Sequence, residues 1–283
     1  MPTYPSPYSY LKSQSGGSST PDSLLLIKGG LLAAADVQEL DPVNNPPVTT
    51  GARLSFSADG VSPTRLQGDA SQSLPFGDLA TQSITVATWV KFNNLLGGFQ
   101  RDRVFSIRTG GQNNWIELYV ENANTIRASC KRTSTVSSAD SSPVSTGVWY
   151  HIAVVWDHSA TTLTIYLNGA SATTATGSNS NNGNPSVAGI CLAAKSQNNC
   201  HQSGFFQDFG IWNKALAANE VAAIASAAFD LGTNSGNYQS SANLKLWWSM
   251  QKRTGNAAAV VDSSGNFNIG SMLGTYTLST DVP

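Results

Sequence analysis

Two glutamates at strand spacing are the residues of this chain that could act together in hydrolysis. Glu117 and Glu121 fall on one face of an alternating segment, because the side chains of a β-strand repeat with a period of two. Two carboxylates about 5 Å apart could flank a glycosidic bond and cleave it with retention. The residue between them on that face is Tyr119 rather than an acid. We therefore expect both glutamates at a solvated sheet edge, and we interpret Glu39 and Asp41, before a proline break, in the same way.

The histidines and cysteines do not form a recognisable catalytic or zinc pattern. A serine triad needs a positioned histidine and acid, whereas His151 lies inside an alternating segment, where a satisfied or surface side chain is expected. Cys191, Cys200 and His201 have a Cys-x8-Cys-His spacing that structural zinc sites do not use. Cys191 and Cys200 could instead close a loop as a disulfide, and reduced thiols are the equal alternative. The sequence therefore predicts a protein that is not an enzyme.

The charge balance excludes two classes of partner. The 283 residues contain 16 Lys+Arg and 17 Asp+Glu, a formal net charge of −1, and only 12% are charged. No basic surplus is available to neutralise nucleic-acid phosphates. The longest apolar runs, such as 24–27 and 31–35, are too short to cross a bilayer. We expect neither nucleic-acid binding nor membrane insertion.

Short alternating segments separated by turns dominate the chain, and 40% hydrophobic residues suffice for a core. These segments cover 54–57, 84–92, 104–107, 115–120, 125–130, 149–156, 163–167, 204–212 and 244–250. Asn168-Gly169 is typical of a tight hairpin turn. Residues 215–228 have apolar side chains at helical spacing and predict one short helix that starts near Asn213 or Asn219. Strands without intervening helices indicate an all-β sandwich or barrel.

The N-terminal region has a different composition. Residues 1–23 are rich in Pro, Ser, Gly and Tyr without any period, and they predict an extended arm. Its tyrosines could anchor a partner surface, or the segment could be a frayed terminus. Residues 24–28 predict a strand, and 41–47 a break. No basic start followed by an apolar stretch is present after Met1, so we expect no signal peptide.

Four of the alternating segments carry a recognisable pattern in a fixed order. They read Ile84-Thr-Val-Ala-Thr-Trp-Val-Lys-Phe, Trp149-Tyr-His-Ile-Ala-Val-Val-Trp-Asp, Leu163-Thr-Ile-Tyr-Leu-Asn-Gly and Phe206-Gln-Asp-Phe-Gly-Ile-Trp-Asn-Lys-Ala-Leu. Together they resemble the laminin-G-like domains, which have a concanavalin A-like jelly roll. The resemblance implies an all-β sandwich of two antiparallel sheets with one short helix. We predict an extended N-terminal arm over 1–23 and a laminin-G-like jelly-roll domain over 24–283, with its core at 53–226 and a C-terminal strand segment at 243–283.

The resemblance also indicates where a ligand would bind. Jelly rolls hold sugars on concave faces and rim loops, by aromatic stacking and hydrogen bonds from polar side chains. Trp115 is the best candidate platform, because the polar loop 110–114 delivers it at the start of a strand. The polar contacts that we expect around it are Asn113, Asn114, Tyr119, Arg101 and Arg103. The tryptophans that we expect to serve packing instead are Trp89, Trp149, Trp156, Trp212 and Trp247.

Calcium is the one metal that the sequence gives reason to consider. In the family that the chain resembles, an Asp of the closing strand often helps to hold a calcium ion, and Asp208 matches it. Asp59, in Ser-Ala-Asp-Gly, is a second candidate oxygen ligand, since calcium prefers hard oxygen donors. In the alternative interpretation, Asp208 pairs with a backbone amide or an arginine and shapes the sheet edge.

These features predict a non-enzymatic surface protein of a bacterial virus, a capsid decoration or fibre that binds host-surface carbohydrate. The arrangement of the domain and its C-terminal segment, Leu244–Met250 followed by Asp262-Ser-Ser-Gly, is similar to that of phage laminin-G-like proteins. The arm would contact other virion proteins, and a homo-oligomer is left open. The alternatives are an extracellular bacterial adhesion or carbohydrate-binding module, and a capsid cement protein without a ligand.

Overall fold

The computed structural model describes residues 55–60, 64–68, 81–96, 103–109, 114–122, 124–132, 135–177, 187–195, 200–226, 229–253, 259–266 and 268–283. Within them it contains one α-helix, α2 (Ala218–Ile224), and one 3-10 turn, η1 (Ser241–Asn243). All other elements are strands, which confirms the predicted all-β class. They are β1 (Ser55–Asp59), β2 (Arg65–Gly68), β3 (Ile84–Phe92), β4 (Arg103–Thr109), β5 (Asn114–Asn122), β6 (Thr125–Arg132), β7 (Thr135–Asp140), β8 (Trp149–Asp157), β9 (Thr162–Leu167), β10 (Ala170–Thr176), β11 (Val187–Leu192), β12 (Ser203–Trp212), β13 (Leu244–Arg253), β14 (Ala259–Asp262), β15 (Gly270–Leu273) and β16 (Tyr276–Ser279).

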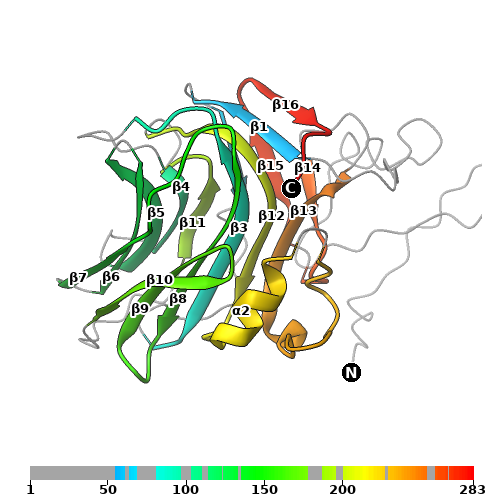
Figure 1. Ribbon diagram of the computed structural model, residues 1–283. Helices are drawn as coiled ribbons and strands as arrows, with labels where there is room; N and C mark the ends of the chain where they lie inside the picture. Colours follow the sequence, from blue (N-terminus) through cyan, green and yellow to red (C-terminus); the bar gives the residue numbers. More distant parts are fainter. Residues whose placement is uncertain are drawn as a thin grey trace, which may run out of the picture.

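The strands pair in an antiparallel manner along one continuous path that folds over into two layers (Figure 1). Layer 1 has the order β10-β9-β8-β3-β12-β13, and β1 pairs with β12 and β16. Layer 2 has the order β14-β15-β2-β11-β4-β5-β6-β7. The two free edges meet where Thr173 of β10 donates a hydrogen bond to the carbonyl oxygen of Asp140 in β7, at 2.6 Å. This arrangement is the predicted jelly-roll sandwich.

The core between the layers follows from alternation along the strands. In β3, Ile84, Val86, Val90 and Phe92 all point into it and are almost fully buried, on the face that the sequence predicts. The opposite side of β3 faces away from the core, as a period of two requires. Each layer therefore presents a second, outer face, and these two outer faces are where a ligand could bind.

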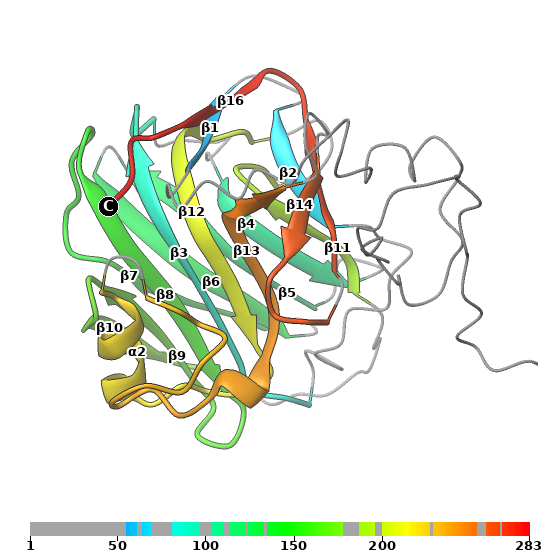
Figure 2. The same cartoon turned by 90° about the vertical axis from the view of Figure 1, so that its right-hand side faces the viewer.

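The helix α2 covers part of the outer face of layer 1 (Figure 2). Leu216, Val221 and Ile224 are buried there in a second apolar cluster with Trp212, as the helical spacing predicts. The predicted start near Asn219 is confirmed, because α2 begins at Ala218 with Ala217 as the N-cap residue, whereas the alternative Asn213 lies outside the helix. No helix among the described residues is long and apolar enough to cross a membrane.

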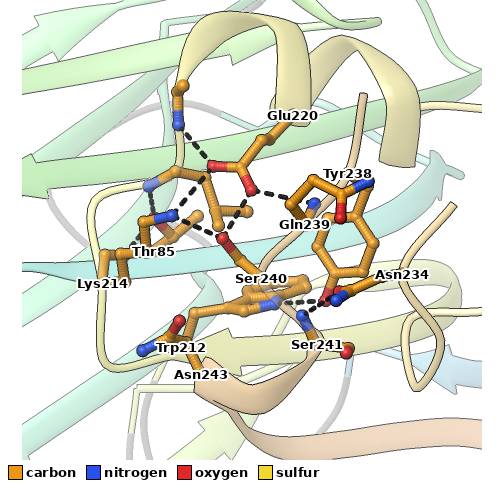
Figure 3. A network of polar contacts seen from close by, with 12 residues as sticks. Thr85, Trp212, Lys214, Glu220, Asn234, Tyr238, Gln239, Ser240, Ser241 and Asn243 are labelled. Carbon is orange, nitrogen blue, oxygen red and sulfur yellow. Dashed lines mark hydrogen bonds and ion pairs between the residues drawn. The ribbon is translucent and has the colours of Figure 1, made fainter. Parts of the chain in front are cut away.

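A buried polar network fastens α2 to the sheet (Figure 3). The Glu220 carboxylate accepts hydrogen bonds from the Ala217 backbone N–H at 3.1 Å, the Gln239 N–H at 3.1 Å and the Ser240 hydroxyl at 2.5 Å. The Lys214 ammonium lies 3.4 Å from the same carboxylate. Glu220 thereby joins the start of the helix to the segment before η1, although the two are 20 residues apart.

The predicted hairpin turn after β9 is confirmed. Asn168 and Gly169 have φ angles of +50° and +82°, the left-handed conformation that a tight two-residue turn needs. A Cβ on Gly169 would lie 3.0 Å from the Cα of Ala222 in α2, so glycine also permits the close approach of the helix. Cys191 and Cys200 are not joined by a disulfide. The arm 1–23, the strand 24–28 and the break 41–47 lie outside the described residues.

Candidate functional site

The outer face of layer 2 is polar, and its central strands are β4, β5 and β6. Alternation in β5 sends Ile116, Leu118 and Val120 into the core. The residues between them, Trp115, Glu117, Tyr119 and Glu121, must point outward. Side chains from β4 and β6 lie directly across from them, because the register pairs Glu117 with Ser106 and Ser129.

Glu117 is the centre of a buried ion-pair network. Its Oε2 accepts a hydrogen bond from Arg103 Nε at 2.9 Å, and its Oε1 from Arg108 Nε at 2.8 Å and from Ser106 Oγ at 3.2 Å. The side chain is only 1% exposed. The expectation of a solvated sheet edge is therefore wrong, because β5 lies inside layer 2 between β4 and β6. The carboxylate is fully engaged by two guanidinium groups and serves to hold them in place.

Arg103 and Tyr119 form the second part of this network. The Arg103 guanidinium carbon lies 4.2 Å from the centre of the Tyr119 ring, a cation–π contact that covers one ring face. Tyr119 is 5% exposed, and its hydroxyl shares a hydrogen bond with Ser129 at 3.1 Å. Both predicted ligand-contact residues thus lie in the buried layer below the surface, where they support the face.

Arg127 of β6 ties the far end of this face together. It donates two hydrogen bonds to Asp140 of β7, at 2.6 and 2.8 Å, and one to Glu121 of β5 at 2.8 Å. The hydrogen bond to Asp140 raises the pKa of the Arg127 guanidinium despite the opposing effect of burial. Three adjacent strands are therefore joined by one guanidinium.

Trp115 lies at the surface of this face, half-buried, between two cations. Arg108 of β4 and Lys131 of β6 are its cross-strand neighbours, and Val136 of β7 follows Lys131 in the same row. The Arg108 guanidinium carbon lies 5.8 Å from the indole centre. The sequence interpretation missed Arg108 and Lys131, although the alternation of 125–130 and a tight connection between β5 and β6 could have revealed Lys131.

Three predicted contact residues cannot be placed at this site. Arg101 and Asn113 lie outside the described residues. The backbone of Asn114 begins β5, but its side chain is not described. The structure therefore brings together Trp115, Tyr119 and Arg103 from the predicted set.

The outer face of layer 1 is aromatic. Trp156 and Trp212 are fully buried as expected. Trp89, Trp149 and Trp247 are half-buried rather than core residues: Trp247 packs against the second apolar cluster as expected, and Trp89 and Trp149 have ring contacts with His151 and Phe205. The alternation of 84–92 already places Trp89 on the side opposite the core, so this signal was present in the sequence.

Part of this aromatic face is closed by the C-terminal segment. Lys91 lies over the Phe205 ring at 4.7 Å and over the Trp149 ring at 5.8 Å. Asp281 forms an ion pair with Lys91 and accepts a hydrogen bond from the Trp149 indole nitrogen at 2.9 Å. The hydrogen bond from Lys91, and then that from Trp149, lower the pKa of Asp281. The chain end accordingly lies beside this face (Figure 2).

A small cavity remains between the aromatic face and α2. It is lined on the sheet side by Trp89, His151 and Asp208, and on the other by Phe229 and neighbouring apolar residues. His151 is 3% exposed, and its Nδ1 has no hydrogen-bond partner among the described residues. The expectation that His151 is a satisfied or surface residue is therefore wrong for this atom. Burial lowers the pKa of His151 to about 3, so the imidazole is neutral at neutral pH.

The calcium prediction concerns Asp208 and Asp59. Asp208 lies in β12 with φ +51° and accepts a hydrogen bond from the Trp247 indole at 3.1 Å. Asp59 pairs with Ser203, five residues before Asp208, so the two backbones lie roughly 16 Å apart at the rise of a strand. One ion cannot be shared by both. The described residues contain no cluster of three or more acidic, His or Cys side chains suited to a metal, and calcium binding stays a prediction.

Comparison with known proteins identifies a sequence family and several structures of similar fold. Residues 66–222 match the family model described as the concanavalin A-like lectin/glucanases superfamily. No curated protein matches the chain. A candidate carbohydrate-binding protein from Bacteroides ovatus superposes with a TM-score of 0.54 at 13% identity, over 81% of this chain and 60% of that one.

Two further solved structures show weaker superpositions. A heptameric SAP-like pentraxin from Limulus polyphemus is 20% identical, with a TM-score of 0.48 over 62% of this chain and 82% of that one. The CBM40 domain of Ruminococcus gnavus IT-sialidase, bound to α2,3 sialyllactose, is 16% identical, with a TM-score of 0.42 over 60% and 98% of the two chains.

Proposed function

Because the chain belongs to the concanavalin A-like lectin/glucanases superfamily, we propose that it is a non-enzymatic carbohydrate-binding protein whose ligand lies on the outer face of layer 2. The position of Trp115 is the observation that carries this proposal. Its indole is half-buried between Arg108 and Lys131, on a face where Glu117 forms ion pairs with Arg103 and Arg108. An aromatic ring with charged donors beside it is suited to the apolar face and the hydroxyl rim of a sugar.

The network below Trp115 supports a rigid site. Arg108 is fixed by Glu117, which Arg103 also engages, so the donor beside the indole is already oriented before a ligand arrives. A preorganised site loses less conformational entropy on binding than a flexible one. The same ion pairs leave Glu117 without the freedom that a nucleophile or general acid needs, and this favours binding over hydrolysis.

We place this binding protein on the surface of a bacterial-virus particle, where residues 1–23 would contact other virion proteins. The support is the resemblance of its arrangement and C-terminal segment to phage surface proteins. An extracellular adhesion module and a cement protein without a ligand are the alternatives. Co-purification with virus particles through caesium chloride gradients tests this setting, and a protein found only free of particles would contradict it.

A glycan array with matched tryptophan variants tests the binding function and its site. We expect selective binding by the native protein and a loss of roughly tenfold or more in Trp115→Ala, because stacking on the indole is removed. Trp89→Ala is the control, since Trp89 is also half-buried but lies on the outer face of layer 1. It should bind as the native protein does.

Three results would lead elsewhere. A loss confined to Trp89→Ala would move the site to layer 1. A blank array would contradict carbohydrate binding and favour the cement role. The array is run in calcium and again in chelator, and a loss of binding in chelator that Asp208→Asn reproduces would support the calcium prediction.

A further inference from the structure

Positive charge is concentrated on the outer face of layer 2. The cations on this face are Arg65, Arg103, Arg108, Arg127 and Lys131; Arg103 and Arg108 share it because a register shift interrupts the alternation in β4. The carboxylates on the same face are Glu117, Glu121 and Asp140. The whole chain has one more acid than base, so this excess of cations is a local separation of charge. Such a face attracts anions.

The carboxylates of this face do not neutralise it evenly. Glu121 and Asp140 both pair with Arg127 toward β7, so Arg127 is fully compensated there. Glu117 is shared by Arg103 and Arg108. Around Trp115, Arg108 and Lys131 have only the shared Glu117 carboxylate as a nearby counter-charge, so this part of the face keeps an excess of positive charge.

Lys131 completes this end of the face. Its ammonium makes no hydrogen bond or ion pair with any residue that the structure describes, and its side chain is partly exposed. It lies directly across from Trp115, with Cβ atoms about 5 Å apart in such a pair. Arg108 occupies the equivalent position on the other strand. A sugar ring stacked on the indole would thus have one cation at each edge.

From this geometry we infer that the ligand of the Trp115 site is an acidic glycan, whose carboxylate or sulfate ester is recognised by Lys131 and Arg108. This inference rests on the proposed function and adds the class of sugar. The hydroxyl oxygens of a neutral sugar could accept hydrogen bonds from these cations, whereas an anionic substituent adds the attraction between opposite charges to each such bond.

The experiment compares each array hit with its own neutral form. Hits that contain uronate are neutralised by carboxyl reduction, and sulfated hits are neutralised by desulfation. The sugar chain stays the same in both cases, so the two treatments distinguish the two sources of charge. We expect the hits to be acidic and their neutral forms to bind roughly tenfold more weakly. Affinity for the acidic form should also fall as NaCl rises from about 0.05 to 0.5 M.

A lysine pair supplies the matched variants. Lys131→Gln should weaken the acidic hit several-fold and leave the neutral form unchanged, because only the ammonium is lost. Lys245→Gln in β13 of layer 1, whose ammonium donates to the Ala242 carbonyl oxygen at 3.3 Å, should change neither. Polyglutamate, an anion without a sugar ring, should not compete with the acidic hit.

The possible outcomes separate this inference from the proposed function. Neutral hits that need Trp115, or acidic hits unaffected by neutralisation, would overturn the acidic-glycan inference and leave carbohydrate binding standing. Acidic hits that survive Trp115→Ala would overturn the proposed site. Competition by polyglutamate would show that charge alone is recognised, and an array without hits would overturn both.

Discussion

His151 links burial of a single side chain to the acid stability of the protein. Burial lowers its pKa to about 3, whereas a histidine in an unfolded chain titrates near pH 6.5. Between these values a proton binds the unfolded state and not the folded one. Above about pH 6.5, His151 therefore makes no pH-dependent contribution to the free energy of unfolding. Below it, we expect the free energy of unfolding to fall by about 1.4 kcal/mol per pH unit from this residue, measured by urea unfolding between pH 7 and 5.

The matched variants remove one imidazole each. His151→Phe keeps an aromatic ring beside Trp89, whose ring centre lies 5.3 Å away, and should flatten the pH dependence. His158→Gln is the control, because it removes an imidazole from the turn after β8, outside the cavity that His151 lines. Equal slopes in the native protein and in His151→Phe would contradict the assignment.

At the scale of elements, Glu220 decides whether α2 stays on the sheet. Burial by itself raises the pKa of Glu220, but hydrogen bonds from Ser240, Ala217 and Gln239 and the charge of Lys214 lower it below its ordinary value. Because the pKa is lower in the folded state, this stabilisation is present above the ordinary pKa of about 4.3 and is lost below it. We expect Glu220→Gln to lower the free energy of unfolding by about 2 kcal/mol at pH 7, measured in urea.

Asn219→Ala is the control for this change. Asn219 lies on the exposed side of the same short helix, so its replacement should alter stability by less than about 0.5 kcal/mol. The Glu220→Gln effect should also shrink as the pH falls below about 4.3, because a proton then binds the carboxyl in the unfolded chain more readily than in the folded one. A variant as stable as the native protein at pH 7 would mean that packing of the apolar face alone holds α2.

For the whole molecule, the last strands decide whether the two layers close. β14 pairs with β13 of layer 1, and β15 joins β14 to β2, so these strands connect layer 1 to the rest of layer 2. A chain that ends at residue 269 loses β15 and β16, and we expect it not to fold cooperatively. A chain that ends at residue 279 keeps every strand and should fold, with a small loss from the exposed Lys91–Asp281 pair. Near-UV circular dichroism and thermal unfolding measure both.

A fragment limited to 66–222 extends this test. It corresponds to the region that the family model matches, but it lacks β1, β13 and β16 and the fully buried Trp248. We expect it to stay unfolded, because β12 would lose its pairing with β13 and β1 and the core would lose the side chains of those strands. A cooperative thermal transition in this fragment would show that the C-terminal strands are an addition to an independent domain.

Strong alternation made the long strands predictable. The bounds of β3 agree with the predicted 84–92, because large apolar residues recur there at every second position. β10, Ala170–Thr176, was missed because its small, mostly exposed residues carry no such pattern. Its strand conformation depends on pairing with β9 across the turn at Asn168 and Gly169. The sequence analysis also did not predict β7, β11 and β15 as separate strands, and their conformation likewise depends on pairing with a neighbouring strand.

The candidate site, like the strands, was predictable from the sequence only in part. The sequence by itself determined the all-β class and the turn residues, and it singled out Trp115 as an aromatic side chain at the start of a strand after a polar loop, because these follow from the local sequence pattern. Only the tertiary structure decided that Glu117 is buried between two arginines and that Lys131 lies across from Trp115. Those facts depend on which strands become neighbours and in what register, and pairing between distant segments is set by the packing of the whole sheet.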